Sequence, residues 1–352
     1  MIPKDKEIQM DNPLICFNVF GRKQLFFLVI VISVFCILFC SCVTNQQYSR
    51  KKKHMDVRSF QHKKRSVQIS PKNYMIYNHK QERVSIESII YSLKDIDVVF
   101  IGEMHDDPVA HYFQKQMLKE VFEHYFFKAY ASKRRQIVLS MEMFERDVQI
   151  ILDEYLFDII DERHFLASSR AWNNYLFDYH PLVKFAKKNN IRVLAANAPR
   201  RYVHRVAQYG KKSLNDLSST AKAWVAPLPY KEPSKALTKR FEDFQKKASA
   251  ITPAHDNDLF KKSHFLEAHN LWDATMAFSL SEELANTPKV LIIHLNGYFH
   301  SQSGLGIPEH LANYRPDVKM MTITIVRSNN FPDFDSSFAD SGDYIIITES
   351  VE

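Results

Sequence analysis

The run 97–101, Asp-Val-Val-Phe-Ile, is short and apolar, and Gly102-Glu103-Met104-His105-Asp106-Asp107 follows it directly. A short apolar run with β-branched residues predicts a buried strand, and the polar residues mark its end. Asp107-Pro108 is typical of a helix start, because Asp caps the helix and Pro suits its first position. We expect this helix to continue to about Ala131. The stretch therefore predicts a strand, a polar loop and a helix in succession.

The same alternation recurs along the chain. Further apolar runs rich in Val and Ile predict strands at 136–141, 191–196, 290–295, 320–326 and 344–348. Buried strands that alternate with helices predict an α/β fold, with a mostly parallel, doubly wound sheet flanked by helices. The segment 211–262 holds four prolines and two helical patterns but no strand, so we expect a small helical insertion over the sheet edge. The α/β domain then comprises residues 81–210 and 263–352.

Polar residues follow each of the first four predicted strands. Because the carboxyl ends of parallel strands meet at one edge of a sheet, we expect these four loops to converge. Two of the loops share the form Gly-x-x-His, with Gly102 before His105 and Gly297 before His300. A glycine suits a sharp exit from a strand, where a Cβ would clash or φ is positive.

His105 and His300, together with Glu103 and Glu142, would offer two nitrogen and two oxygen donors to a divalent metal. A single histidine at a strand end is more often a hydrogen-bonded structural residue. The doubled motif and the two carboxylates favour a shared site. All four cysteines lie within the first 42 residues, so a metal in the remainder must rely on His, Asp, Glu, Tyr or Met.

The N-terminal segment has the pattern of an export signal. Arg22-Lys23 precede the apolar run 25–39, which is short for a membrane span and suits the core of a signal peptide. The sequence Phe39-Cys40-Ser41-Cys42 resembles a bacterial lipobox, with the small Ser41 before Cys42. Residues 1–42 are therefore predicted to be a lipoprotein signal peptide, with Cys42 as the lipidation site. An uncleaved anchor helix is the alternative, and it implies the same location.

Residues 43–80 carry ten basic residues and one acidic residue, a net charge of +9. With few apolar residues, they predict a disordered tether that either contacts anionic headgroups or serves as a solvated spacer. The whole chain has a net charge of +7 and residues 1–42 contribute +1, so residues 81–352 carry −3. Because the basic charge belongs to the tether, no nucleic-acid partner is expected for the folded body.

Several short motifs, taken in order and spacing, resemble the ChaN-type haem-binding lipoproteins over about residues 85–330. This family belongs to the superfamily of Tiki proteases and erythromycin esterases. The resemblance implies an α/β fold with a helical part, lipid anchoring in the bacterial cell envelope at the outer membrane, haem or iron uptake, and a homodimer. It also implies that the Gly-x-x-His pair is the superfamily's metal site. The motifs are Gly102-Glu-Met-His-Asp106 with His111, Glu142-Met-Phe, Asn197-Ala-Pro-Arg200, Trp224-x-x-Pro227-Leu-Pro229, Leu271-Trp-Asp273-Ala-Thr-Met-Ala277, and Gly297-x-x-His300 with Gly304-x-Gly306-Ile-Pro308.

Haem is flat and apolar with two carboxylates, so a haem site needs aromatic walls, an axial ligand and cations. Tyr202 is the first candidate for the iron ligand, because a phenolate suits ferric iron. Arg200 would pair with a propionate, and His269 and Trp272 would form a wall of the cleft. His269 stands where we expect Gln in relatives. The plainer alternatives are a packing tyrosine, a solvated arginine face and a hydrogen-bonded core histidine.

Two other functions compete with haem binding. In a metal-dependent hydrolase, Glu103 or Glu142 would be the base, and a metal held by His105 and His300 would acidify a water molecule. In an adhesion or structural lipoprotein the carboxylates would be structural, which leaves the doubled Gly-x-x-His motif unexplained. We favour haem binding, with haem as the cofactor and a divalent metal as the alternative.

Overall fold

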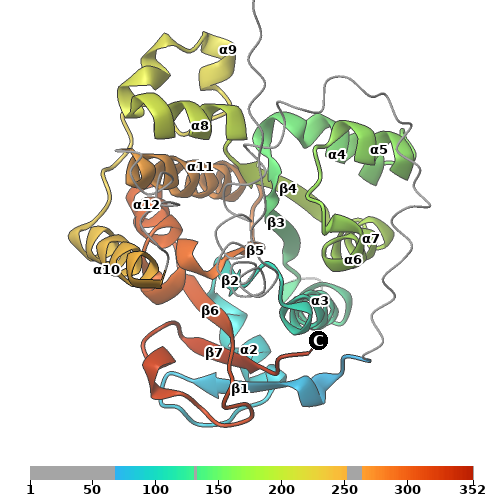
Figure 1. The fold of residues 1–352 in the computed structure, drawn as a ribbon. Helices are drawn as coiled ribbons and strands as arrows, with labels where there is room; N and C mark the ends of the chain where they lie inside the picture. Colours follow the sequence, from blue (N-terminus) through green and yellow to red (C-terminus); the bar gives the residue numbers. More distant parts are fainter. Residues whose placement is uncertain (1–67, 131–132, 252–263, 352) are drawn as a thin grey trace, which may run out of the picture. The chain divides into compact units, whose positions relative to one another are not determined.

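The computed structural model describes residues 68–130, 133–251 and 264–351. These residues form a seven-stranded sheet in the order β1-β7-β6-β2-β5-β3-β4 (Figure 1). All neighbouring strands are parallel except β1 and β7, which are antiparallel. The predicted α/β fold with a mostly parallel sheet is confirmed. The strands are β1 (Tyr74–Asn78), β2 (Val98–Glu103), β3 (Gln136–Glu145), β4 (Arg192–Asn197), β5 (Val290–Gly297), β6 (Met320–Arg327) and β7 (Tyr344–Thr348).

Helices cover both faces of the sheet. They are α2 (Ile86–Ser92), α3 (Pro108–Phe122), α4 (Gln149–Leu156), α5 (Glu162–Ser168), α6 (Tyr175–Asp178), α7 (His180–Lys188), α8 (Arg200–Tyr209), α9 (Ser219–Lys222), α10 (Lys235–Ile251), α11 (Phe265–Asn286) and α12 (Ile307–Tyr314). The Asp107 carboxylate caps α3 by accepting the backbone N–H groups of Val109 and Ala110. A π-helical turn at Glu123–Phe127 extends α3, so the helix ends before the predicted Ala131.

Alternate residues of the strands enter two apolar layers. Val99 and Ile101 of β2 join the larger layer beneath α2–α7, whereas Val98 and Phe100 pack beneath α11 and α12. In Figure 1 these two groups of helices lie on opposite sides of the central strands. Because both faces are covered, the strands need continuous apolar runs, and those runs are what the sequence shows.

The described part of the predicted insertion, residues 211–251, is helical and holds no strand. Leu214, Val225 and Tyr230 join a separate apolar cluster with α8 and the first half of α11, so this segment packs on helices. One contact nevertheless reaches the sheet edge. Arg240 of α10 donates hydrogen bonds to the carbonyl groups of Phe299 and Gln302, in the loop after β5.

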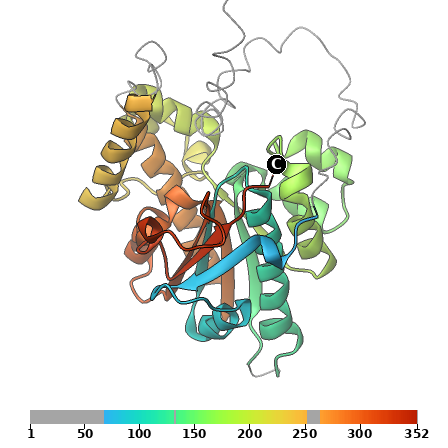
Figure 2. The ribbon, with the colours of Figure 1, turned by 60° about the horizontal axis from the view of Figure 1, so that its bottom comes forward.

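The structure corrects the predicted tether. Residues 74–78, within the predicted disordered segment 43–80, form β1 and pair with β7 at the edge of the sheet (Figure 2). Tyr74, Ile76 and Tyr77 are buried there. This strand was not predicted from the sequence because it is short and because its partner strand, β7, lies almost at the other end of the chain.

Residues His54–Glu352 form one compact unit, which contains all seven strands and every described apolar cluster. Residues 43–67, the apolar run 25–39 and Cys42 lie outside the described residues. Within the described ranges, none of the helices combines the length and apolar character needed to cross a membrane.

Candidate functional site

The loops that follow β2 and β5 meet side by side at the carboxyl edge, where Glu103 is the register partner of Gly297. The structure brings Glu103, His105, Glu142 and His300 into one cluster. The His105 Nε2 atom lies 3.9 Å from Glu142 Oε1, and the His300 Nε2 atom lies 3.7 Å from the same oxygen. The four residues predicted for the metal site therefore share one location.

Each of the two imidazoles is oriented by a carboxylate at its other nitrogen. His105 Nδ1 lies 2.9 Å from Glu103 Oε1, and His300 Nδ1 lies 2.5 Å from Asp273 Oδ1. An Nδ1–H that donates to a carboxylate leaves the Nε2 lone pair directed away from it. Both Nε2 atoms therefore face the carboxylate of Glu142.

Glu142 is held at the end of β3. The register between β3 and β4 shifts between Met141 and Glu145, so Glu142 lies in an irregular strand end rather than in the predicted loop. Glu142 Oε2 accepts the backbone N–H of Gly297 at 2.6 Å, and its carbonyl group accepts the Asn197 amide. These bonds leave Oε1 as the oxygen that faces the two imidazoles.

The two Gly-x-x-His glycines each make room for the other motif. A Cβ on Gly102 would lie 2.7 Å from the Cα of Tyr298, in the loop that carries His300. A Cβ on Gly297, whose φ is −59°, would lie 2.9 Å from His105 Nε2. For Gly297 the requirement is therefore close approach rather than a positive φ.

A buried network fixes Glu103. Its Oε1 atom accepts bonds from His105 and from the Tyr179 hydroxyl at 2.5 Å, while Oε2 accepts the Gln114 amide at 2.6 Å. His111 bridges Glu103 and Asp178, with each nitrogen 3.2 Å from a carboxylate oxygen. Burial alone would raise the pKa of Glu103, but His111 and His105 hold it well below its usual value. Glu103 is therefore ionised.

His111 is the cation of this network. Burial alone would lower its pKa, but Glu103 and Asp178 raise it to about 10. A protonated His111 keeps Glu103 charged, and Glu103 in turn keeps His105 in one orientation. His111 therefore supports the site without contacting the position that the two imidazoles face.

His269 lies behind His300 and is buried, which matches the alternative of a hydrogen-bonded core histidine. Its ring stacks on that of His300 at 4.2 Å, and its Nδ1 atom lies 3.1 Å from Asp273 Oδ2. Although His269, Asp273 and His300 are close enough to surround an ion, their facing atoms are already bonded to one another. Burial lowers the pKa of His269, so the imidazole is neutral. We therefore interpret His269 and Asp273 as supports that orient His300.

The facing atoms of His105, Glu142 and His300 form a second set of potential metal donors. Their N···O separations of 3.7 and 3.9 Å are too long for hydrogen bonds. Each separation leaves room for a small cation or a water molecule between that imidazole and Glu142. The carboxylate behind each imidazole is the usual outer partner of a metal-bound histidine. Imidazole nitrogens and carboxylate oxygens are the donor types that a divalent metal such as zinc uses.

Two half-buried indoles flank the imidazoles. Trp172 meets the edge of the His105 ring at 4.8 Å, and Trp272 meets that of His300 at 6.0 Å. The Arg200 guanidinium lies over Trp172 at 5.6 Å. His105, at 10% side-chain exposure, is more accessible than His300 at 2%. The cluster is therefore reached from the side of His105 and Trp172.

Tyr202, the predicted iron ligand, is half-buried on the first turn of α8. It packs, as Trp272 does, against the apolar cluster between α8 and α11. Arg201 lies over its ring at 4.4 Å and is itself bonded to Asp147. Arg200, Tyr202 and Trp272 thus lie around α8 and α11, whereas His269 is buried beneath them.

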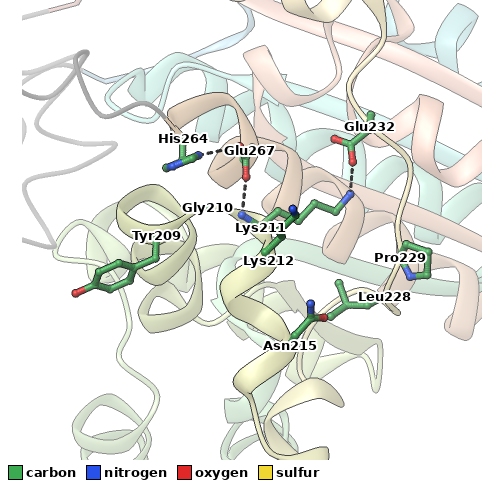
Figure 3. A pocket seen from close by; sticks show the side chains of 10 residues that line it. All are labelled: Tyr209, Gly210, Lys211, Lys212, Asn215, Leu228, Pro229, Glu232, His264 and Glu267. Atoms are coloured by element: carbon green, nitrogen blue, oxygen red, sulfur yellow. Dashed lines mark hydrogen bonds and ion pairs between the residues drawn. The ribbon is translucent and has the colours of Figure 1, made fainter.

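A separate groove of about 740 Å³ lies near the end of α8 (Figure 3). Glu267 closes one side, because it accepts the backbone N–H of Lys211 and lies 2.8 Å from His264 Nδ1. The Lys211 ammonium group is bonded to Glu232. The groove shares no residue with the imidazole cluster. It is lined by Tyr209, Gly210, Lys211, Lys212, Asn215, Leu228, Pro229, Glu232, His264 and Glu267.

Comparison with known proteins identifies the family. Residues 89–311, more than half of the chain, match the family described as haem-binding uptake, Tiki superfamily, ChaN. The chain belongs to the ChaN family. No curated protein matches its sequence. The resemblance predicted from the ordered motifs is confirmed.

Two solved structures are similar to this chain. A ChaN of Campylobacter jejuni with cofacial haem is 19% identical, with a TM-score of 0.60 over 80% of this chain and 98% of that one. An erythromycin esterase variant in its open conformation is 13% identical, with a TM-score of 0.40 over 78% of this chain and 82% of that one. The first likeness supports the fold of this ChaN family member.

Sequence reasoning did not assign a role to several residues that the structure brings to the site. Asp273 follows His269 by one helical turn, a spacing that places both on one face and could have indicated the pair. Asp178, Tyr179 and Trp172 come from a segment with no strand of its own. They had no comparable signal, because only the packing of α6 and α7 against α3 brings them to Glu103 and His105.

Proposed function

We propose that this protein binds haem at the carboxyl edge of the sheet, for uptake of haem or iron. Its membership of the haem-binding uptake family carries the proposal. Three side chains at this edge suit the group, since two flat indoles flank the imidazoles and a guanidinium lies over one of these indoles. Bound haem would supply an iron centre and two carboxylates.

The residues have distinct roles in this proposal. Trp172 and Trp272 would contact the apolar ring system, because both are half-buried and edge the two imidazoles. Arg200 would bind a propionate, and its position over Trp172 already brings a cation to the rim of an aromatic wall. Tyr202 would ligate ferric iron through its phenolate.

The proposal is tested by titrating the protein with ferric haem and following the titration by absorption spectroscopy. Replacing Arg200 with Ala is expected to weaken binding by about 1.5–3 kcal/mol, because a charge-assisted bond is lost. Tyr202→Phe should abolish the charge-transfer band of a tyrosinate complex and leave the fold intact. Arg205→Ala, on the same helix but paired with Asp216, should leave haem affinity unchanged. An unchanged spectrum in Tyr202→Phe would move the ligand to a histidine, and no haem binding at all would refute the function.

We also propose that the protein is a lipoprotein anchored through Cys42 in the outer membrane of a bacterial cell. The support is the apolar run 25–39 followed by Ser41 and Cys42. In a Cys42→Ser variant we expect loss of lipid labelling, with the protein in the soluble fraction or retained as precursor. Cys40→Ser is the matched control and should keep the label. Labelling that persists in Cys42→Ser would contradict the assignment.

One observation favours a second function, divalent-metal-dependent hydrolysis. Two carboxylate-oriented imidazoles direct their Nε2 atoms at the same oxygen of Glu142. A metal held by these atoms would supply Lewis-acid chemistry. Glu142 faces the same position and is the candidate base, while Glu103 is fully occupied by its donors and serves to position His105.

Metal analysis separates the two functions. We expect His105→Ala and His300→Ala each to lower the bound metal by at least about tenfold if a site is shared. The double variant should be little worse than either single variant, because one loss already opens the site. His79→Ala, at an exposed turn, is the control and should change nothing. Strictly additive effects would show that the two histidines do not share an ion.

A further inference from the structure

The amino edge of the sheet, opposite the imidazole cluster, is strongly basic. Cations stand directly before three of the four central parallel strands, β3, β5 and β6, and Lys94 lies four residues before the start of β2. They surround one depression of about 360 Å³, together with Asp95 and Asp97. The cations are Lys94, Lys133, Arg134, Arg135, Lys289 and Lys319. Since residues 81–352 carry a net charge of −3, this local excess of positive charge is distinct from the rest of the body.

Arg135 has a structural role in this surface. Its guanidinium donates to the carbonyl groups of Leu93, Ile96 and Val290 and so joins the starts of β2 and β5. The other five cations are exposed. We call this surface the basic platform, and Arg135 holds together the strand starts on which it lies.

Aromatic side chains border the same surface. Phe127 is 71% exposed and Tyr130 is 82% exposed, at the end of the α3 segment that leads into Lys133 and Arg134. The Lys133 backbone N–H is bonded to the carbonyl group of Tyr130, which fixes the two against each other. The Arg135 guanidinium, just after this segment, is bonded to the carbonyl group of Leu93 in the connection from α2 to β2, and Figure 2 shows the end of the segment near that connection. Exposed aromatic rings beside cations are typical of proteins that lie at a membrane interface.

We propose that this amino edge docks on an anionic phospholipid surface. The basic platform would face the headgroups, Phe127 and Tyr130 would enter the interface, and the carboxyl edge with its imidazole cluster would face away from the membrane. Each Lys or Arg near such a surface contributes about 1 kcal/mol. The two exposed aromatic rings favour a membrane over a nucleic acid, because no base-stacking groove accompanies them among the described residues. The proposal is independent of haem binding.

The test uses the compact unit His54–Glu352, which lacks the proposed anchor but holds the complete sheet and its core. It is sedimented with phosphatidylcholine vesicles with and without phosphatidylglycerol. We expect binding only when phosphatidylglycerol is present, and weaker binding as salt is added. Joint substitution of Lys133→Glu, Arg134→Glu and Lys289→Glu should lower the affinity at least about tenfold.

A matched control changes net charge equally on another face. Lys212→Glu, Lys231→Glu and Lys235→Glu together, all at exposed positions, should lower the affinity less than about threefold. The pair Phe127→Ser and Tyr130→Ser should weaken binding, whereas the equally exposed pair Phe157→Ser and Ile159→Ser should not. Melting temperatures identify any variant that fails to fold, and the aromatic pair then provides the test. Equal loss in the two charge variants, or preferential binding to a single-stranded DNA oligonucleotide, would overturn the proposal.

Discussion

Glu103→Ala is expected to lower the free energy of unfolding by about 3–5 kcal/mol, measured by urea denaturation of the unit His54–Glu352. The carboxylate is 1% exposed and receives two hydrogen bonds from Gln114 and Tyr179 besides its contacts with His105 and His111. Its removal leaves the His111 cation with only one carboxylate. It also leaves the buried donor groups of Gln114 and Tyr179 without an acceptor. The loss would be a large part of the stability of an ordinary domain.

Two variants separate charge from size in this experiment. Glu103→Gln keeps the volume and one acceptor oxygen, so it should destabilise less than alanine but still disturb His105. Glu232→Ala removes an exposed carboxylate from its pair with Lys211 and should cost less than about 1 kcal/mol. A loss below 1 kcal/mol for Glu103→Ala would show that the buried network does not stabilise the fold.

Removal of β1 should have the next largest effect. A fragment that begins at Gln81 lacks Tyr74, Ile76 and Tyr77, and burial of three such side chains contributes on the order of 5 kcal/mol. Tyr74 packs against Phe113 at 5.2 Å, and the Tyr77 hydroxyl donates to the carbonyl group of Pro332. The fragment should therefore unfold at a much lower temperature and expose the edge of β7.

The matched fragment begins at Gln68 and retains β1. It should melt within a few degrees of the unit that begins at His54, because the apolar clusters described above start at Ile69. Within an intact chain, Ile76→Asp should reproduce most of the loss by placing a charge in the core. Equal melting temperatures for the Gln81 and Gln68 fragments would show that β1 contributes little.

Six of the seven strands could be predicted from the sequence, because a strand covered on both faces must be apolar throughout. β1 lies at an edge, and its short alternating pattern resembles many surface loops. The helix from Asp107 was predictable from its cap, whereas its early end was not. That end depends on the π-helical turn at Glu123–Phe127 and on contacts of Tyr125 with residues far along the chain.

The convergence of Glu103, His105, Glu142 and His300 followed from topology alone, because parallel strands bring their carboxyl ends to one edge. The roles within that cluster did not follow. Whether a carboxylate faces an ion or orients a histidine depends on differences of an ångström between side chains. Glu103 is enclosed by Gln114 of α3 and by Tyr179 between α6 and α7, and Asp273 takes the corresponding place behind His300. The sequence could not decide between a core and a cleft position for His269, because an imidazole in either place has the same sequence signal.

The reciprocal packing of Gly102 and Gly297 links the effects of mutations in the two Gly-x-x-His motifs. Each glycine leaves room for the loop of the opposite motif, so a larger residue at Gly102 would displace the loop that carries His300. Second-site suppressors of a Gly102 substitution should therefore arise at Tyr298 or Ser301 rather than beside His105. If His105 were lost, Gly297 would be released from its close contact with that imidazole, whereas Gly102 would stay constrained by the backbone of Tyr298. The two copies therefore evolve as a single unit, although almost two hundred residues of chain separate them.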